Sequence, residues 1–329
     1  MTERITPRPN LDSSPIRAFF RRYATVLAFV LLCAILTFIV PWRDGTPVFL
    51  SQVNILNVIR QVSVVGIMAV GMTFVILLGQ IDLGVGSMLA FTGMIAAVMQ
   101  HNDLGLISSV LGALALGALT GIGVGILVTK GSIPSFVATL GILAAYRGAT
   151  LLTSGQPVLG LKEDFRFIGA GEILGMPFPI IIFALVVAIG VIVLRRTRFG
   201  RYTYAVGGNE AAARLSGINV DAIKIAAFVI SGVCAAIAAL ILTARLNSGQ
   251  PLAGQGYELD VIAAVVVGGT SLAGGRGSVG GSVIGAMLIG VLSNGLTLLN
   301  VPADWQPIVK GTIIVFAVLL DQLSRRRSR

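Results

Sequence analysis

The sequence predicts an all-α integral membrane protein with about ten transmembrane helices and with both termini in the cytoplasm. Of its 329 residues 55% are hydrophobic and only 12% are charged, whereas soluble globular chains carry about 25% charged residues. The mean hydropathy is +0.92. Repeated apolar runs approach ~20 residues, the length at which a helix crosses a hydrocarbon core of ~30 Å.

Ten apolar runs mark the predicted spans. Glycines shorten or interrupt the third and the eighth, for which we expect short or broken helices. In chain order the spans are 23–40, 58–78, 84–99, 104–128, 136–152, 178–194, 223–243, 260–274, 279–299 and 308–320. No linker divides the chain, so we expect a cytoplasmic tail over 1–22, a single transmembrane domain over 23–322 and a basic cytoplasmic tail over 323–329.

The positions of the basic residues predict the orientation. Short cytoplasmic loops carry an excess of lysine and arginine, and most of the 24 basic residues are cytoplasmic if the N-terminus lies inside. The exceptions are Arg43, Lys162, Arg166 and Arg245 outside, and Arg60, Arg147 and Lys310 within spans. An even number of spans keeps the RRRSR tail inside. Because the net charge of +10 resides in these short loops, we expect the lipid bilayer as a partner and no nucleic acid.

The longest cytoplasmic loop, 195–222, reads RRTRFGRYTYAVGGNEAAARLSGINVDA. A break at Gly207-Gly208 is expected to precede a short helix that Asn209 caps and Gly217 closes. We interpret this helix as a docking element for a cytoplasmic partner. Its residues are Asn209, Glu210, Ala211, Ala212, Ala213, Arg214 and Gly217, among which Glu210 and Arg214 have the i,i+4 spacing of a helical ion pair.

Three glycine-rich clusters, 77–87, 247–260 and 265–282, contain polar residues. Such glycines either pack helices closely or allow broken helices whose exposed backbone lines a cavity. Asp82 and Asp260 each have a second interpretation as helix caps, and Arg147 and Arg60 have one as snorkelling side chains. The candidates to face a polar pathway are Gln80, Asp82, Arg147, Gln250, Gln255 and Glu258.

Signals for catalysis are absent from the sequence. No GxxxxGK[ST] phosphate loop is present, so the chain is not expected to hydrolyse nucleotide. The single histidine, His101, has no neighbours that would form a metal site or a catalytic triad. Cys33 and Cys234 both lie in apolar runs, where unpaired thiols are expected. We therefore expect no enzyme, no metal and no cofactor.

Five strings in order resemble the ribose-type permease subunits of bacterial ABC sugar importers: GQIDLGVGS, IPSFVATLGILAAYRG, YAVGGNEAAARLSGINV, GQGYELDVIAAVVVGGTSLAGGRGS and LSNGLTLL. The resemblance, over about 61–321, implies a second permease copy of the same or a similar chain. It also implies cytoplasmic ATP-binding subunits, a periplasmic sugar-binding protein and the bacterial inner membrane. The helix 209–215 then resembles a coupling helix, although four residues separate Ala212 from Gly217 where the wider importer pattern has three.

Two classes of function remain open at this point. The first is import of a monosaccharide or sugar-like solute by alternating access, driven by separate ATPase subunits. The second is a self-sufficient ion-coupled transporter or channel, for which Asp82 and Asp260 could bind the coupling ion. The sequence names neither the sugar nor the pairing of permeases.

Overall fold

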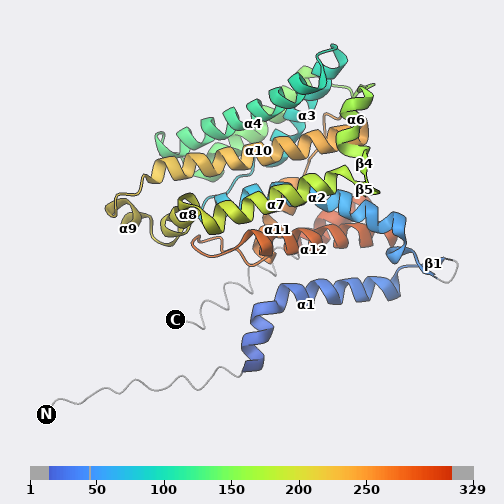
Figure 1. Ribbon diagram of the computed structural model, residues 1–329, viewed down its shortest axis with the longest axis horizontal. Helices are drawn as coiled ribbons and strands as arrows, with labels where there is room; N and C mark the ends of the chain where they lie inside the picture. The colour runs from blue at the N-terminus through green and yellow to red at the C-terminus, as the bar shows by residue number, and fades with distance from the viewer. Residues whose placement is uncertain (1–14, 44–45, 313–329) are drawn as a thin grey trace.

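The computed structural model describes residues 15–43 and 46–312, and its helices run mostly along one axis (Figure 1). The α-helices are α1 (Pro15–Ile39), α2 (Gln52–Leu77), α3 (Val85–His101), α4 (Leu106–Thr129), α5 (Ser135–Thr153), α6 (Glu163–Ala170), α7 (Phe178–Arg196), α8 (Arg198–Gly208), α9 (Glu210–Leu215), α10 (Val220–Leu246), α11 (Tyr257–Val267) and α12 (Val279–Leu298). Two short 3₁₀ helices are η1 (Val48–Leu50) and η2 (Ala303–Trp305).

Short strands form three antiparallel pairs. They are β1 (Trp42–Arg43) with β2 (Thr46–Pro47), β3 (Val158–Leu159) with β6 (Ser248–Gly249), and β4 (Glu172–Ile173) with β5 (Met176–Pro177). The predicted all-α class is therefore confirmed, with strands confined to connections.

Six helices are long and apolar enough to cross a membrane: α2, α4, α5, α7, α10 and α12. Shorter apolar helices cover Thr25–Ile39 and Val85–His101. These helices confirm a protein with several membrane spans. They do not establish the predicted total of ten. Of the last predicted span, 308–320, only 308–312 belong to the described residues, and these are helical.

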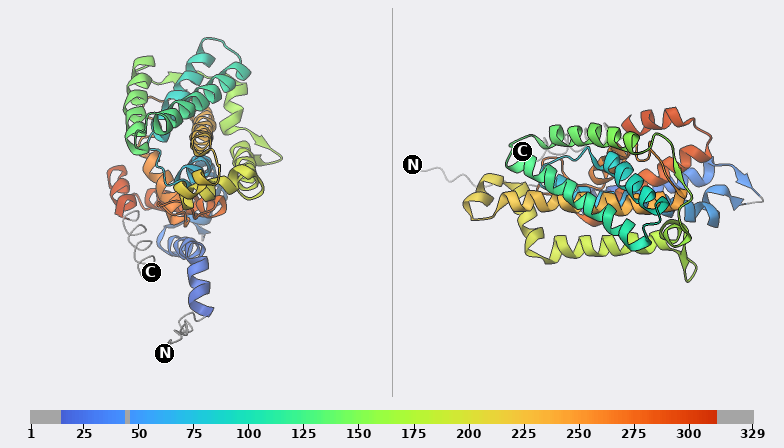
Figure 2. Two further views of the ribbon diagram at one scale, coloured as in Figure 1. Left: turned by 90° about the vertical axis from the view of Figure 1, so that its left-hand side faces the viewer. Right: turned by 90° about the horizontal axis from the view of Figure 1, so that it is seen from above.

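The centre of the bundle is formed by α2 and α10. In their most apolar windows 83% and 67% of the residues are buried, against 17% in α5 and in α7. A helix that is apolar on all sides must lie inside the protein or face lipid, and α2 does the former. Figure 2 shows the outer helices arranged around this centre.

Close packing of α4 on α10 depends on a repeat of small residues. Gly117, Gly121 and Gly125 are four residues apart on α4, and a Cβ at any of them would collide with the backbone of α10. This is the small-xxx-small arrangement by which helices approach closely in lipid. The packing role that we considered for glycine therefore applies to α4.

The eighth predicted span, 260–274, is a short and broken helix, as its glycines led us to expect, and it is helical only up to Val267. The helix in this region, α11, has 11 residues, a length of only ~16 Å at 1.5 Å per residue. It ends at Val267, after which Gly269, Gly274 and Gly275 adopt positive φ angles. Those angles lie outside the helical region, so the apolar run is divided into a half-length helix and an irregular segment.

The predicted break at Gly207-Gly208 is misplaced by one residue, because both glycines lie in the last turn of α8 and the interruption is at Asn209. The loop 195–222 contains two helices, α8 and α9, separated at Asn209. Gly207 lies against the carbonyl oxygen of Leu77, where any side chain would collide. At the other end of the chain, α1 begins at Pro15, within the predicted tail 1–22.

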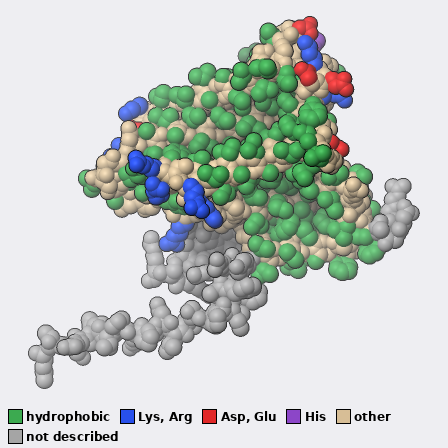
Figure 3. Space-filling view, in the orientation of Figure 1, with side chains coloured by type: hydrophobic (Ala, Val, Ile, Leu, Met, Phe, Trp, Pro, Cys, Tyr) green, Lys and Arg blue, Asp and Glu red, His purple; other side chains and the backbone are tan. Residues whose placement is uncertain are grey.

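The two ends of the bundle differ in charge. α8 and α9 lie at one end, and α6 with β1, β4 and β5 lies at the other (Figure 1). On the face shown in Figure 3, lysine and arginine side chains gather at the α8–α9 end, whereas most of the visible acidic side chains lie at the α6 end. This asymmetry agrees with the positive-inside pattern if α9 is cytoplasmic.

Candidate functional site

Two interrupted helices meet inside the bundle. The first break (78–84) separates α2 from α3, and the second break (247–256) separates α10 from α11. Gly86, in the first turn of α3, lies against the carbonyl oxygen of Gly254 and the carboxylate of Glu258, so that any side chain at 86 would collide with both. Broken helices are tolerated at membrane depth only where the backbone is buried in protein or lines a cavity.

Short side chains hold the backbone of the first break through hydrogen bonds. The backbone amides of Ile81 and Leu83 donate to the hydroxyls of Ser135 (3.1 Å) and Thr139 (3.0 Å) on α5. The Asp82 carboxylate, only 2% exposed, accepts hydrogen bonds from the Gly84 amide (3.0 Å) and the Ser231 hydroxyl (2.8 Å).

Asp82 therefore braces the turn before α3 and joins it to the middle of α10. Gln80 is half-buried beside it, and its side-chain amide donates to the carbonyl oxygen of Leu78 at 3.5 Å.

The second break is held by a cation instead. The guanidinium of Arg147, on α5, donates to the carbonyl oxygens of Pro251 (3.3 Å) and Ala253 (3.0 Å). Arg147 therefore binds the backbone of the second break and does not extend toward the membrane surface, as a snorkelling side chain would. Gln250 donates to the Ser248 hydroxyl at 2.8 Å. Gln255, in contrast, is exposed to solvent.

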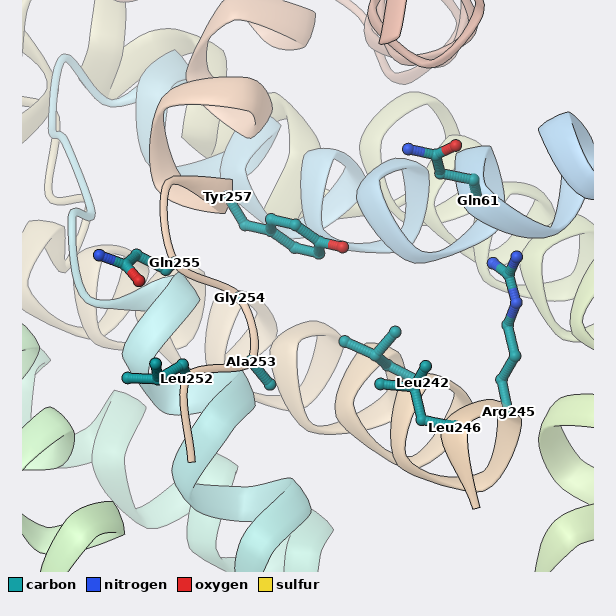
Figure 4. Close-up of a pocket in the computed structure, with 9 residues that line it drawn as sticks. All are labelled: Gln61, Leu242, Arg245, Leu246, Leu252, Ala253, Gly254, Gln255 and Tyr257. Carbon is teal, nitrogen blue, oxygen red and sulfur yellow. The ribbon is translucent and has the colours of Figure 1, made fainter. Parts of the chain in front are cut away.

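A pocket of about 440 Å³ opens beside the second break (Figure 4). In Figure 4 the Tyr257 ring and the Arg245 side chain extend toward one shared space, Gln61 lies beside it on α2, and Gln255 points away on the other side of the break. The lining residues are Gln61, Leu242, Arg245, Leu246, Leu252, Ala253, Gly254, Gln255 and Tyr257.

An aromatic face with amide, phenol and guanidinium groups suits a small hydroxylated solute. Sequence reasoning missed Gln61, Arg245 and Tyr257. Gln61 and Arg245 lie at the ends of apolar runs. Tyr257 lies in GQGYELD, in which we singled out only Gln255, Glu258 and Asp260.

Charged groups surround the start of α11. Asp260 does not cap this helix, as one interpretation expected: α11 begins after Gly256, and the Asp260 carboxylate accepts a hydrogen bond from Lys310 Nζ at 2.7 Å. Both side chains of this ion pair are largely buried. Oε2 of Glu258 is buried without a hydrogen-bond partner among the described residues. A smaller pocket of about 130 Å³ lies here, with Gln255 and Tyr257 in its wall as well.

At the other end of the bundle, ion pairs fix α9 to the start of α10. The Asn209 side chain caps α9 by accepting from the Ala212 amide at 3.0 Å. Glu210 accepts from Arg214 at 3.2 Å and from Lys224 on α10 at 2.8 Å. The hydrogen bond from Lys224 is the main reason why the pKa of Glu210 lies below its ordinary value, and the charges of Lys224 and Arg214 add to it. The predicted cap and the predicted i,i+4 pair are therefore both present.

Two further features of α9 bear on its surface. Ala211 and Ala212 are exposed, but Ala213 is buried, so the small surface predicted from three alanines consists of two. The difference follows from helical geometry, because three consecutive residues cannot share one face. Gly217 ends the helix region with a φ of +81°, as a glycine after a C-terminus should.

The sequence matches a protein family described as branched-chain amino acid transport system / permease component, over residues 54–318. It is 48% identical over 311 residues to the ribose import permease protein RbsC of Haemophilus influenzae, covering 93% of this chain and 94% of the relative. Identity is 47% over 279 residues to RbsC of Bacillus subtilis, with 84% and 87% covered. The xylose transport system permease protein XylH of Escherichia coli is 38% identical over 366 aligned positions, with 91% and 93% covered.

The fold is also similar to that of a solved structure, a metal-chelate type ABC transporter in an inward-facing conformation. The TM-score is 0.52 at 15% identity, covering 91% of this chain and 98% of that one. At that identity the similarity concerns the fold alone. The chain belongs to this permease family, as a sugar-permease-type membrane subunit of an ABC importer that leaves ATP hydrolysis to partner subunits.

Proposed function

We propose that this chain forms the translocation pathway for a pentose or a sugar-like solute in an ATP-driven importer of the bacterial inner membrane. The observation that carries the proposal is the meeting of two broken helices beside a pocket lined by Tyr257, Arg245 and Gln61. Transporters commonly bind solutes where interrupted helices meet. The ribose and xylose permeases to which the chain is similar support the substrate class.

The pathway proposed here follows the second break. Gln250, Gln255 and Glu258 lie along it, and Arg147 holds its backbone. Gln80 and Asp82 belong to the proposal as residues of the fixed wall on the other side of the pathway, where Gln80 is half-buried and Asp82 is buried in the conformation described. The solute would pass between the two breaks as the helices rock, without tight binding to the permease.

We assign coupling to the ATPase to α9, which transmits its movement to the pocket through α10. The N-terminal end of α10 carries Lys224 and Asp221, which pair with Glu210 and Arg214 of α9. Its C-terminal end carries Arg245, in the pocket wall. One helix of 27 residues, ~40 Å long, thus connects the exposed alanines of α9 to the pathway. A displacement of α9 moves the pocket wall with it.

The proposed assembly has cytoplasmic ATP-binding subunits at the α8–α9 end and a periplasmic sugar-binding protein at the α6 end. A second copy of this chain, or a similar permease, completes the channel. We propose ten spans with both termini cytoplasmic, with a single transmembrane domain over 23–322 and tails on either side. The charge asymmetry between the two ends supports this orientation.

The test is reconstitution with the ATPase and binding-protein subunits in liposomes, with ribose uptake and ATP hydrolysis as readouts. The Ala212→Glu variant should lose ATPase binding and uptake, because a bulky charge replaces the exposed small surface of α9. Ala170→Glu is the matched control, since Ala170 is also an exposed alanine in a short helix but lies at the α6 end. It should bind the ATPase normally.

Two outcomes would contradict the proposal in different ways. Uptake at the parent rate by Ala212→Glu would show that α9 is not the coupling element, and it would leave the importer assignment intact. Solute uptake by the permease alone, driven only by an ion gradient, would instead establish the self-sufficient transporter that the sequence left open.

A further inference from the structure

An apolar groove opens on the outer surface of the bundle between α7 and α10, with α2 as its floor. Its volume is about 280 Å³. Ile189 and Val193 of α7 form one wall, Ile230 and Val233 of α10 form the other, and Phe74 of α2 lies at the bottom. α7 packs on α2, α6, α8 and α12. In Figure 1 it lies next to α10 on the viewer's side, and Figure 3 shows this face covered by hydrophobic side chains.

The groove lies within one half of the membrane thickness. Its wall on α7 runs from Val186 to Val193, ~11 Å along the helix, and α7 ends at Arg196. The ten-residue step from Val186 to Arg196 is ~15 Å long, half of a hydrocarbon core of ~30 Å. The groove therefore begins at about the middle of the membrane, and Arg196 lies beyond its end, at the boundary where phospholipid phosphates lie.

Unpaired positive charge marks that boundary. Ile189, Val193 and Arg196 are four and three residues apart, so Arg196 continues the face of α7 that forms the groove wall. Three more exposed arginines lie next to it in the chain, at 195, 198 and 201. Among the ion pairs of the described residues, none involves these four arginines.

We propose that the groove holds an acyl chain of an anionic phospholipid whose phosphate is bound by Arg196 and its neighbouring arginines. An acyl chain suits the apolar walls of a groove within one leaflet, and a guanidinium binds phosphate through two parallel hydrogen bonds. Basic clusters at the cytoplasmic ends of membrane helices attract anionic lipid. This site goes beyond the proposed solute pathway. Only its assignment to the inner leaflet rests on the proposed orientation.

The lipid would lie against α10, the helix that connects α9 to the pocket. Because α7 and α10 are separated by the groove, its occupant sets the spacing between them. A bound lipid therefore contacts the helix that transmits movement from α9 to the pocket. This contact distinguishes it from the other lipids that surround the protein.

Native mass spectrometry of the full chain tests the proposal. The protein is released from mixed micelles that contain equal amounts of phosphatidylglycerol and phosphatidylcholine with the same acyl chains. The parent should retain phosphatidylglycerol preferentially. The Arg196→Gln variant should lower this preference about fivefold, the factor that corresponds to ~1 kcal/mol for one basic residue at the membrane surface.

Two tryptophan variants of α7 test the groove separately from the charge. Ile189 lines the groove and is 51% exposed, whereas Ile192 lies outside its wall and is 56% exposed. Ile189→Trp should fill the groove and reduce retention of both lipids, while Ile192→Trp should leave retention unchanged. If Ile189→Trp does not fold, Ile189→Cys labelled after folding with a bulky thiol reagent makes the same steric test.

Equal retention of the two lipids by the parent would overturn the proposal. Equal effects of Ile189→Trp and Ile192→Trp on lipid retention would overturn it as well. A photo-crosslinker at Val233 in native membranes should capture lipid. If it captures a polypeptide instead, the groove is a protein interface and the proposal is wrong.

Discussion

The two broken helices meet in the same part of the molecule but are held by different chemistry. In the first break, short neutral hydroxyls from α5 bind the backbone amides, and Asp82 is buried against Ser231. In the second break, the long side chain of Arg147 binds two backbone carbonyl oxygens, and the segment borders a pocket. Both solve the same problem, because backbone groups without partners are costly at membrane depth.

The difference indicates which break moves. Ser135 and Thr139 have short side chains, so their hydrogen bonds fix the first break to the backbone of α5. Arg147 reaches its carbonyl partners through a flexible stem, which can follow a displacement of the segment while keeping its hydrogen bonds. We therefore expect the first break to be a fixed support and the second break to be the moving wall. The predictions below test this contrast, from the largest expected effect to the smallest.

The ion pair after the second break should give the largest effect on stability. Lys310→Met leaves the largely buried Asp260 carboxylate without its cation, a change that costs about 3 kcal/mol when a buried pair loses one partner. Thermal unfolding in detergent should detect a clear loss. The double variant Lys310→Met with Asp260→Asn should recover most of it, and failure to recover would mean that the pair does not stabilise α11.

Asp82→Ala should have the next largest effect, by loosening the first break. It removes the acceptor for the Gly84 amide and the Ser231 hydroxyl, and unpaired buried groups cost about 1–3 kcal/mol. The unfolding temperature should fall. Asp82→Asn keeps an oxygen acceptor of the same shape and is the matched control; equal losses in the two variants would contradict the bracing role.

The same residues show which parts of this contrast the sequence predicts and which it does not. Asp82 and Arg147 were identified because a charge in an apolar run is rare and costly. Their partners were not, since Ser231 and Ala253 lie more than a hundred positions away and look ordinary in the sequence. Hydropathy alone does not distinguish α11 from a full span, because a glycine-rich segment buried in protein is as apolar as one in lipid. The glycines of 260–274 predict a broken helix, but they do not show that it ends at Val267. The cap and ion pair of α9 were predictable because their rules are local.

Arg147→Leu should reduce function more than stability. The second break would lose the guanidinium that holds the carbonyls of Pro251 and Ala253, so its position in each state would be poorly defined. Ribose uptake by the reconstituted importer should fall about tenfold, equivalent to ~1.4 kcal/mol in the rate-determining barrier. Arg147→Lys, which keeps the charge but replaces the planar guanidinium by a compact ammonium, should retain part of the rate. A parent rate in both variants would contradict a role in the pathway.

The smallest effect should come from acidification at α9, far from both breaks. The pKa of Glu210 is lowered in the folded protein, chiefly by its hydrogen bond with Lys224. A lowered pKa means that its stabilising contribution is fully present above the ordinary value of 4.5 and is lost as the pH falls through the folded value. The unfolding temperature should therefore drop slightly more between pH 7 and pH 3.5 in the parent than in Glu210→Gln. Identical pH profiles would mean that the pair does not hold α9 to α10.

The most direct test of the account compares thiol reactivity at the two breaks in the reconstituted importer. Cys33 and Cys234 are first replaced by alanine, and one cysteine is placed at Gln255 or at Leu83. Reactivity toward a membrane-impermeant reagent is measured with and without ATP. The account predicts that Gln255→Cys reacts and changes its rate with the nucleotide state, whereas Leu83→Cys stays unreactive throughout. Equal reactivity at both positions, or a rate at Gln255→Cys that ignores ATP, would contradict a moving second break beside a fixed first one.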